Sequence, residues 1–278
     1  MPVVDDAFDF GKIAASNALS DVYAMGGRPT LALAILGWPV DKLPASEARR
    51  VMEGGRYICR MAGITIAGGH SIDSPEPFFG LAATGLVAKT HLKRNNTARP
   101  GDLLYLTKPI GSGTIAAAAR RGIATDEQIE TAVSYMTALN QVGTELGKLE
   151  AVNAMTDITG FGLLGHLAEV CEGSGTSARL IMENIPVMPG VIGHHQSFVY
   201  PDMTMKSFQF LSPKCAQLNA AQILLLCDPQ TSGGLLVCVS PEQQSEYLQL
   251  VRDFGLGGVA DKSIGQMHEQ GAHLIAVG

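Results

Sequence analysis

The hydrophobic positions of the first hundred residues alternate between helical and strand spacing. Residues 9–25 are predicted to form a helix, because their apolar side chains share one face and Asp9 can cap the start. The apolar run at 31–36 predicts a buried strand. The same criteria predict the rest of this half as a helix at 44–62 and strands at 64–67 and 78–87.

The turn pair Pro100-Gly101, which follows several polar residues, marks a boundary in this pattern. We place two domains on either side of it, at 1–98 and 99–278. The second domain is predicted to hold a strand at 103–107, an Ala-rich helix up to Arg121, a helix at 126–146, an irregular connection with one or two short helices at 186–213, and a closing strand pair at 261–277. Strands and helices alternate in both halves, which favours a mixed α/β (α+β) fold with one sheet in each domain.

The amino-acid composition indicates that the chain can bury a sizeable hydrophobic core. Hydrophobic residues make up 46% of the sequence and charged residues 17%. The longest apolar runs are only strand-sized, so we predict no transmembrane span. The first ten residues carry three aspartates and no basic residue, unlike a secretory signal. We therefore predict a cytoplasmic protein.

Charge and cysteine usage narrow the classes of function. A net charge of −6 argues against broad nucleic-acid binding, which needs a positive surface. The 5 cysteines are scattered without a Cys-x-x-Cys pair, so they fit a reducing compartment and suggest no zinc site. The sequence shows neither a Ser-His-Asp arrangement nor a cysteine in a reactive setting. These observations favour small-molecule partners.

Two polar residues of the first predicted helix are candidates for a binding site. Asn17 and Asp21 are four residues apart, so they lie on one face, within the apolar stripe that should meet the core. A carboxylate in such a place is costly unless it is paired or bound to a cation. The alternative is that Asp21 faces solvent near a frayed helix end or assists a cap.

The segment Ala67-Gly68-Gly69-His70-Ser71 follows a predicted strand directly. Glycines there allow backbone N–H groups to approach an anion, and Ser71 adds a hydroxyl, so a phosphate loop is one interpretation. The alternative is a simple turn with a structural histidine. The segment matches neither the Walker pattern nor the dinucleotide fingerprint.

The segment 156–162, with the sequence TDITGFG, gives the sharpest local signal. An acidic residue at a strand end precedes glycines and then a helix that starts near Leu163. Helix starts attract anions, and Asp157 can hold a Mg²⁺ ion that bridges to phosphate oxygens. The alternative is that Asp157 or Thr159 merely caps the helix.

Two further glycine segments, 108–113 and 228–234, stand at predicted corners between elements. Tight backbone geometry is the favoured role for both, although Lys108 could reach a phosphate. His194-His195 is interpreted as a surface turn rather than a metal pair, because adjacent side chains diverge and no third ligand is nearby.

Four motifs taken in chain order resemble those of the selenophosphate synthetase (selenide, water dikinase) family, and the match runs nearly end to end. They are NALSDVYAMGG at 17–27, AGGHS at 67–71, TDITGFG at 156–162 and DPQTSGG at 228–234. Parts of the first and third motifs also occur in the wider superfamily of aminoimidazole ribonucleotide synthetases. The second and fourth motifs, with ILGWP at 35–39, point to the selenium enzyme.

This resemblance implies a function and a set of site residues. The implied reaction makes selenophosphate from selenide, ATP and water, and releases AMP and phosphate. Asp21 and Asp157 match Mg²⁺ ligands of the family, and Asp21 also lies against the nucleotide. Gly69, His70 and Ser71 match its ATP-binding loop, and Asn17 is a neighbour by helix spacing. The implied fold is synthetase-like, with a mixed sheet and helices on one side in each domain, and subunits paired into a homodimer through strands of the first domain.

The family pattern also has a Gly-rich upstream segment with a reactive cysteine or selenocysteine and a lysine, and Met1 aligns after the start of that pattern. We therefore predict that no catalytic nucleophile lies in this chain and that the chain alone cannot complete the selenium chemistry. A missing first strand would also weaken dimerisation. Two rival functions stay open: another ATP-dependent kinase or synthetase of the superfamily, and a nucleotide-binding fragment without activity.

Overall fold

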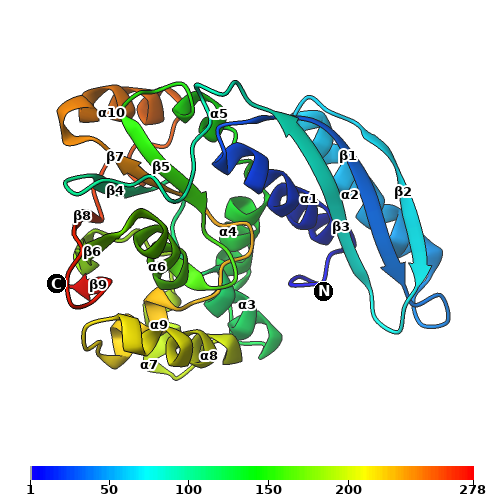
Figure 1. Cartoon of the computed structure of the whole chain (residues 1–278). Helices are drawn as coiled ribbons and strands as arrows, with labels where there is room; N and C mark the ends of the chain where they lie inside the picture. The colour runs from blue at the N-terminus through cyan, green and yellow to red at the C-terminus, as the bar shows by residue number, and fades with distance from the viewer. Residues whose placement is uncertain (1) are drawn as a thin grey trace.

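The computed structural model describes residues 2–278 and contains two sheets, with a long helix between them (Figure 1). One sheet has three strands in the order β2-β1-β3, and the other has six in the order β5-β7-β4-β8-β6-β9. Mixed sheets flanked by helices confirm the predicted fold class.

The three-stranded sheet is built by the first part of the chain. Its elements are α1 (Ala7–Ala24), β1 (Arg28–Trp38), α2 (Ala45–Met61), β2 (Ile66–Asp73) and β3 (Phe78–Leu86). Strand β1 runs parallel to β2 and antiparallel to β3, while α1 and α2 pack together on one face. The Asp6 side chain, rather than that of Asp9, caps α1 by accepting a hydrogen bond from the Asp9 N–H at 2.9 Å.

Strand β1 is not buried on both faces as the sequence predicted. Ala32 and Ala34 point into the core, whereas Leu31, Leu33 and Ile35 are 39 to 45% exposed. The reason is that helices cover only one face of this sheet, so alternate side chains of β1 face outward.

The six-stranded sheet is built by the second part of the chain. Its strands are β4 (Leu103–Leu106), β5 (Val152–Asp157), β6 (Thr176–Leu180), β7 (Leu235–Val239), β8 (Gly265–Glu269) and β9 (Ile275–Val277). The helices are α3 (Ser112–Arg120), α4 (Asp126–Thr137), α5 (Val142–Leu146), α6 (Gly162–Ser174), α7 (Val191–Gln196), α8 (Asp202–Leu211), α9 (Ala220–Leu226) and α10 (Gln244–Asp253), with short 3₁₀ turns at 182–184, 212–214 and 241–243.

Both faces of this second sheet are covered, which corrects the expectation of helices on one side. One face packs against a large core that includes α6, and the other packs against α5 and α10 around Tyr105 and Tyr247. The reason is the alternation of the strands: Leu104 and Leu236 belong to the first core, and Tyr105 and Leu235 to the second.

Three of the predicted elements of this part differ from the structure. The helix predicted at 126–146 is broken into α4 and α5, because Ala138 adopts an extended conformation and the next residues turn towards α1. The closing strands β8 and β9 do not pair with each other, since β6 lies between them. The segment 186–213 is more regular than expected and contains α7 and α8.

Helix α1 connects the two sheets. Ile13 belongs to the large core of the second part, although α1 packs on α2 and β3 of the first part. Ser16 donates a hydrogen bond to the Thr137 carbonyl at 3.0 Å, and Asn140 donates one to the Ser20 hydroxyl at 2.9 Å. The last turns of α1 are therefore fixed against the second sheet. Across residues 2–278, the helices are too short or too polar to span a membrane.

Candidate functional site

A cavity of about 630 Å³ lies where α1 and β3 meet two loops of the second part. We call it the cleft. Asn17 and Asp21 line it from α1, Thr159 and Gly160 from one loop, and Thr231 from the other. The volume falls in the usual range for small-molecule sites. The cleft therefore unites the α1 motif with residues of the two C-terminal glycine motifs.

Asp21 lines this cleft, whereas Asp157 lies near Asp21 without being one of the lining residues. Asp21 is on the last turns of α1 and is exposed, whereas Asp157 is the last residue of β5 and only 6% exposed. The pKa of Asp21 is raised, first by partial burial of its carboxylate and second by the negative charge of Asp157. The two carboxylates are thus close enough for their charges to repel.

Asp157 lacks the partners that a buried carboxylate needs. Among residues 2–278, neither a backbone nor a side-chain donor forms a hydrogen bond to its carboxylate, and no group of three potential metal ligands is found. A charge with so little exposure is costly unless a cation neutralises it. The buried Lys108 ammonium group interacts with the Asp157 charge but forms its hydrogen bonds with two backbone carbonyls instead. Two facing carboxylates offer hard oxygen donors of the kind that magnesium prefers. The donor set therefore fits Mg²⁺.

The proximity of the two carboxylates predicts a pKa change that can be measured without metal. In Asp157→Asn, the pKa of Asp21 should fall, because the second cause of its elevation is removed while the burial remains. Carboxyl ¹³C NMR titration of the metal-free protein measures it. Asp41→Asn, an exposed loop variant, should leave the pKa of Asp21 unchanged. An unchanged value in Asp157→Asn would mean that the two charges do not interact.

The loop after Asp157 is held by His166 of helix α6. The Thr159 N–H donates to His166 Nε2 at 3.0 Å, and the Thr159 hydroxyl lies 3.1 Å from the same atom. Burial lowers the pKa of His166, so the ring is neutral and Nε2 can accept. Thr159 therefore contacts a histidine rather than capping α6 with its side chain, and Gly160 is left open towards the cleft.

Lys108 contacts the protein and not the cleft. Its ammonium group donates to the Ala138 carbonyl at 2.7 Å and to the Ser232 carbonyl at 2.9 Å, and the residue is 5% exposed. Burial lowers its pKa to about 7, opposed by the charge of Asp157. The alternative of a phosphate contact by Lys108 is not supported, because these carbonyls hold the ammonium group in the interior.

The segment 228–234 fixes Asn17 in place. The Ser232 N–H donates to Asn17 Oδ1 at 3.0 Å, and Ser232 itself has a positive φ of 51°. Such a conformation is unfavourable for serine and persists only when its surroundings hold it. The Gln230 N–H also donates to the Thr159 carbonyl at 3.0 Å, so the two loops of the cleft are joined. Asn17 keeps its amide N–H₂ available towards the cleft.

Asp228 and Gln230 belong to the motif at 228–234, but the sequence analysis assigned neither of them a role of its own, and both are buried. Gln230 Oε1 accepts from the Gly111 and Ser112 N–H groups at 3.0 and 3.2 Å. Asp228 accepts from the Thr114 hydroxyl and from Gln230 Nε2, at 2.7 and 2.8 Å. The N-terminus of α3 is therefore occupied by protein side chains, which confirms backbone geometry as the role of the 108–113 segment. The presence of two polar side chains within a glycine motif was the feature of the sequence that could have indicated these buried roles.

His195 is not in a surface turn as predicted. It belongs to α7, is 7% exposed, and places Nε2 2.8 Å from the Thr114 hydroxyl. When that hydroxyl donates its proton to an ionised Asp228, it can accept a hydrogen bond from His195 Nε2. His195 thus ends a buried hydrogen-bonded chain.

Gly69, His70 and Ser71 are not in a loop, and the cleft does not include them. They lie inside β2, where they pair with Ala34, Ile35 and Leu36 of β1. Strand β2 is separated from the cleft-lining strand β3 by β1. Sequence reasoning ended the strand at Ala67 because glycines usually mark turns. Here Gly69 is required by close approach, since a Cβ would lie 2.1 Å from the Ala34 carbonyl oxygen.

The cysteines have no role in the cleft. All five are buried. Burial raises the pKa of Cys59 and Cys215 to about 11, raises that of Cys171 and Cys227 to about 12, and raises that of Cys238 further. Thiols in such surroundings are poor nucleophiles.

Comparison with known proteins connects this architecture to a family. The model "AIR synthase related protein, N-terminal domain" matches residues 1–87, and "AIR synthase related protein, C-terminal domain" matches 99–275. A Pseudomonas putida protein named "Selenide, water dikinase" is 50% identical over 277 residues, which are 100% of this chain and 80% of that protein. The chain belongs to the selenide, water dikinase family. A member from Sulfurovum sp. is 48% identical with the same coverage.

Solved structures place the selenide, water dikinase fold in a wider group. The hydrogenase maturation protein HypE, solved in complex with ATP, superposes with a TM-score of 0.74 at 20% identity, covering 96% of this chain and 75% of that one. Thiamine-monophosphate kinase from Stenotrophomonas maltophilia gives a TM-score of 0.73 at 20% identity, covering 100% of this chain and 80% of that one. At this identity the likeness shows the fold alone.

Proposed function

We propose that this protein acts in the ATP-dependent synthesis of selenophosphate from selenide and water, with AMP and phosphate as the other products. The observation that carries the proposal is the 50% identity to a selenide, water dikinase over the whole chain. It is combined with a cleft lined by Asp21 and by residues of two glycine motifs, with Asp157 close enough to raise the pKa of Asp21. ATP is the ligand that the cleft would take.

In this proposal Asp21 and Asp157 hold Mg²⁺ from opposite sides of the cleft. The ion would neutralise polyphosphate charge, which is most of what phosphoryl transfer requires of a protein. Asp157 is fixed at the end of β5, and Asp21 is fixed because α1 is hydrogen-bonded to the second part of the chain. Asn17 would donate its free amide N–H to the nucleotide. The repulsion between the carboxylates would be relieved on binding.

The partner surface in this proposal is the outer sheet face, defined as the exposed side of β1, β2 and β3. Its exposed apolar side chains are those of Leu31, Leu33, Ile35, Ile72 and Phe78. An apolar sheet face of this kind on a soluble protein is typical of an interface. His70 lies on the same face, opposite Ile35. We propose that two copies pair here as a homodimer.

A charge on the outer sheet face should therefore separate the subunits. Leu33→Asp, at a position 45% exposed, should sediment as a monomer where the unaltered protein sediments as a dimer, because the dimer would bury an unpaired carboxylate. Sedimentation velocity measures this, and circular dichroism reports the fold. Ile123→Asp, equally exposed but away from the sheet, is the control. A monomeric unaltered protein would refute this interface.

Gly69, His70 and Ser71 would contact nucleotide only across that dimer, because their own cleft is beyond β1 and β3. Mixing His70→Ala subunits with Asp157→Asn subunits should then restore about a quarter of the sites, since one mixed dimer site carries neither change. Titration with ATP and Mg²⁺ counts the restored sites. Absence of restoration would remove these three residues from the site.

The reaction itself is tested by following AMP. The chain joined to the upstream segment that the family pattern includes should form AMP and phosphate from ATP when selenide is added. Hydrolysis that ignores selenide, or transfer to another small acceptor, would refute the proposed reaction and favour another kinase or synthetase of the superfamily.

A further inference from the structure

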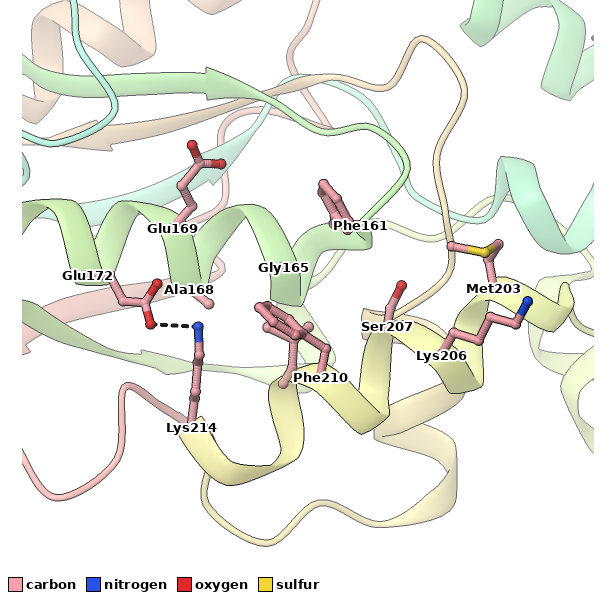
Figure 2. Close-up of a pocket in the computed structure, with 11 residues that line it drawn as sticks. Phe161, Gly165, Ala168, Glu169, Glu172, Met203, Lys206, Ser207, Phe210 and Lys214 are labelled. Carbon is pink, nitrogen blue, oxygen red and sulfur yellow. Dashed lines mark ion pairs between the residues drawn. The ribbon is translucent and has the colours of Figure 1, made fainter.

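A second pocket lies outside the cleft, between helices α6 and α8 (Figure 2). Its volume is about 300 Å³. Met203, Lys206, Ser207 and Phe210 line it from α8, at the spacing of one helix face. Phe161 lines it at the start of α6. We call it the α6–α8 pocket.

The pocket is open because the facing side of α6 carries small residues. Gly165 and Ala168 stand where larger side chains would fill the space between the helices. A Cβ at Gly165 would lie 2.5 Å from the Phe161 Cβ, so the glycine lets this ring stay beside the pocket. Phe161 and Phe210 are 61 and 69% exposed, which leaves two aromatic surfaces at the opening.

Ser207 provides a polar group without a partner. It is 5% exposed, and its Oγ is buried with no hydrogen bond within residues 2–278. Figure 2 shows this hydroxyl pointing towards Phe161, with Phe210 on one side and Met203 on the other. A buried hydroxyl without a partner is unfavourable, and an acceptor in the pocket would relieve it.

The charges around the pocket leave one cation available. Lys214 is paired with Glu172 at 2.6 Å and lies over the Phe210 ring. Glu169 accepts a hydrogen bond from Asn95 at 3.0 Å. Lys206 forms no ion pair with any residue from 2 to 278. The four charges of the lining balance, but Figure 2 shows Glu169 and Lys206 at opposite ends of the pocket, so an anionic group is favoured only at the Lys206 end.

We propose that the α6–α8 pocket binds a small aromatic carboxylate. The ring would lie between Phe161 and Phe210, one carboxylate oxygen would accept a hydrogen bond from the Ser207 hydroxyl, and the other would approach Lys206. The volume is at the small end of ligand sites, which favours one or two fused rings over a nucleotide. This site is separate from the cleft and independent of the function proposed for it.

The probe for this site is naphthalene-2-carboxylate, followed by saturation-transfer NMR and titration calorimetry on the full chain. Phe210→Ala should weaken binding by about 10-fold, because an exposed ring can be removed without disturbing the core. Met205→Ala, on the same helix but outside the pocket, should leave the affinity unchanged. Failure of the probe to bind, or equal affinities of the two variants, would overturn the proposal.

Charge and the hydroxyl are tested separately. Lys206→Gln should weaken the binding of naphthalene-2-carboxylate by about 2- to 5-fold and leave the affinity for the uncharged 2-naphthalenemethanol unchanged. The control, Lys262→Gln at an exposed position, should change neither affinity. Ser207→Ala should weaken both probes by several-fold. Equal affinities of the unaltered protein for the alcohol and the carboxylate would show that Lys206 does not recognise the carboxylate. The proposal of an anionic ligand would then be wrong as well.

Discussion

Asp157→Asn should weaken the binding of ATP in the presence of Mg²⁺ by about 10- to 100-fold, which is the effect of losing one charged contact to a bound ion. The same variant should bind ATP without metal as well as the unaltered protein, or better. The reason is that Asp157 by itself repels phosphate and raises the pKa of Asp21. The substitution therefore weakens ATP binding when Mg²⁺ is present and does not weaken it when Mg²⁺ is absent. Titration calorimetry under the two conditions measures both affinities.

Asp41→Asn is the matched control, because it removes one carboxylate charge from an exposed loop. It should change neither affinity by more than a small factor, since exposed charges are screened. If Asp157→Asn lowers the affinity for ATP equally with and without Mg²⁺, the variant has a general structural defect and has not simply lost a metal ligand.

Asp228→Ala should lower the free energy of unfolding by about 2 to 4 kcal/mol, the largest effect on stability that we expect. The change removes the acceptor of the Thr114 hydroxyl and of Gln230 Nε2, and both donors stay buried. Gln230 Nε2 would then keep only its hydrogen bond to the backbone carbonyl of residue 228, so the orientation of Gln230 towards the N-terminus of α3 would be held less firmly. Urea unfolding followed by circular dichroism measures the difference.

The loss in Asp228→Ala should also depend on pH. Burial raises the pKa of Asp228 to about 7 in the folded chain, above its unfolded value. A raised carboxyl pKa contributes stability that is fully present below the unfolded pKa and is lost as pH rises through the folded one. The destabilisation should therefore be about 1 to 3 kcal/mol larger near pH 5 than near pH 8.

The control for this second variant is Asp253→Ala. Its carboxylate accepts a hydrogen bond from Gln249 on the exposed side of α10, so its loss should change stability by less than about 0.5 kcal/mol at either pH. If Asp228→Ala were as mild as Asp253→Ala, the buried network would not stabilise the fold.

Local features of the chain predicted much of the fold. The bounds of α2, β3 and β4 follow the predicted ranges within two residues, because caps, glycines and apolar runs are properties of neighbouring positions. The break between α4 and α5 did not follow from such features. There Asn140 bonds to Ser20 and to the Gly233 carbonyl, partners that lie far away in the sequence.

The same distinction applies to the candidate site. The motif at 156–162 was predicted to end a strand and begin a helix, and β5 and α6 confirm it. The motif at 67–71 was predicted to be a loop, and pairing with β1 makes it a strand instead. His195 was misinterpreted, and the structural partners of Lys108 were not foreseen, because Thr114 and Ser232 are brought to these residues only by the fold. Binding of Mg²⁺ by Asp21 and Asp157 stays a prediction.

The central claim is that Asp21 and Asp157 hold Mg-ATP together across the cleft. A double-mutant cycle with Asp21→Asn, Asp157→Asn and the double variant, read by titration with ATP and Mg²⁺, tests it most directly. If both contact the same bound Mg-ATP, the double variant should lose less than the sum of the single losses, by about 1 kcal/mol or more. Losses that add within about 0.5 kcal/mol would show that the two residues act independently, and would contradict a shared site.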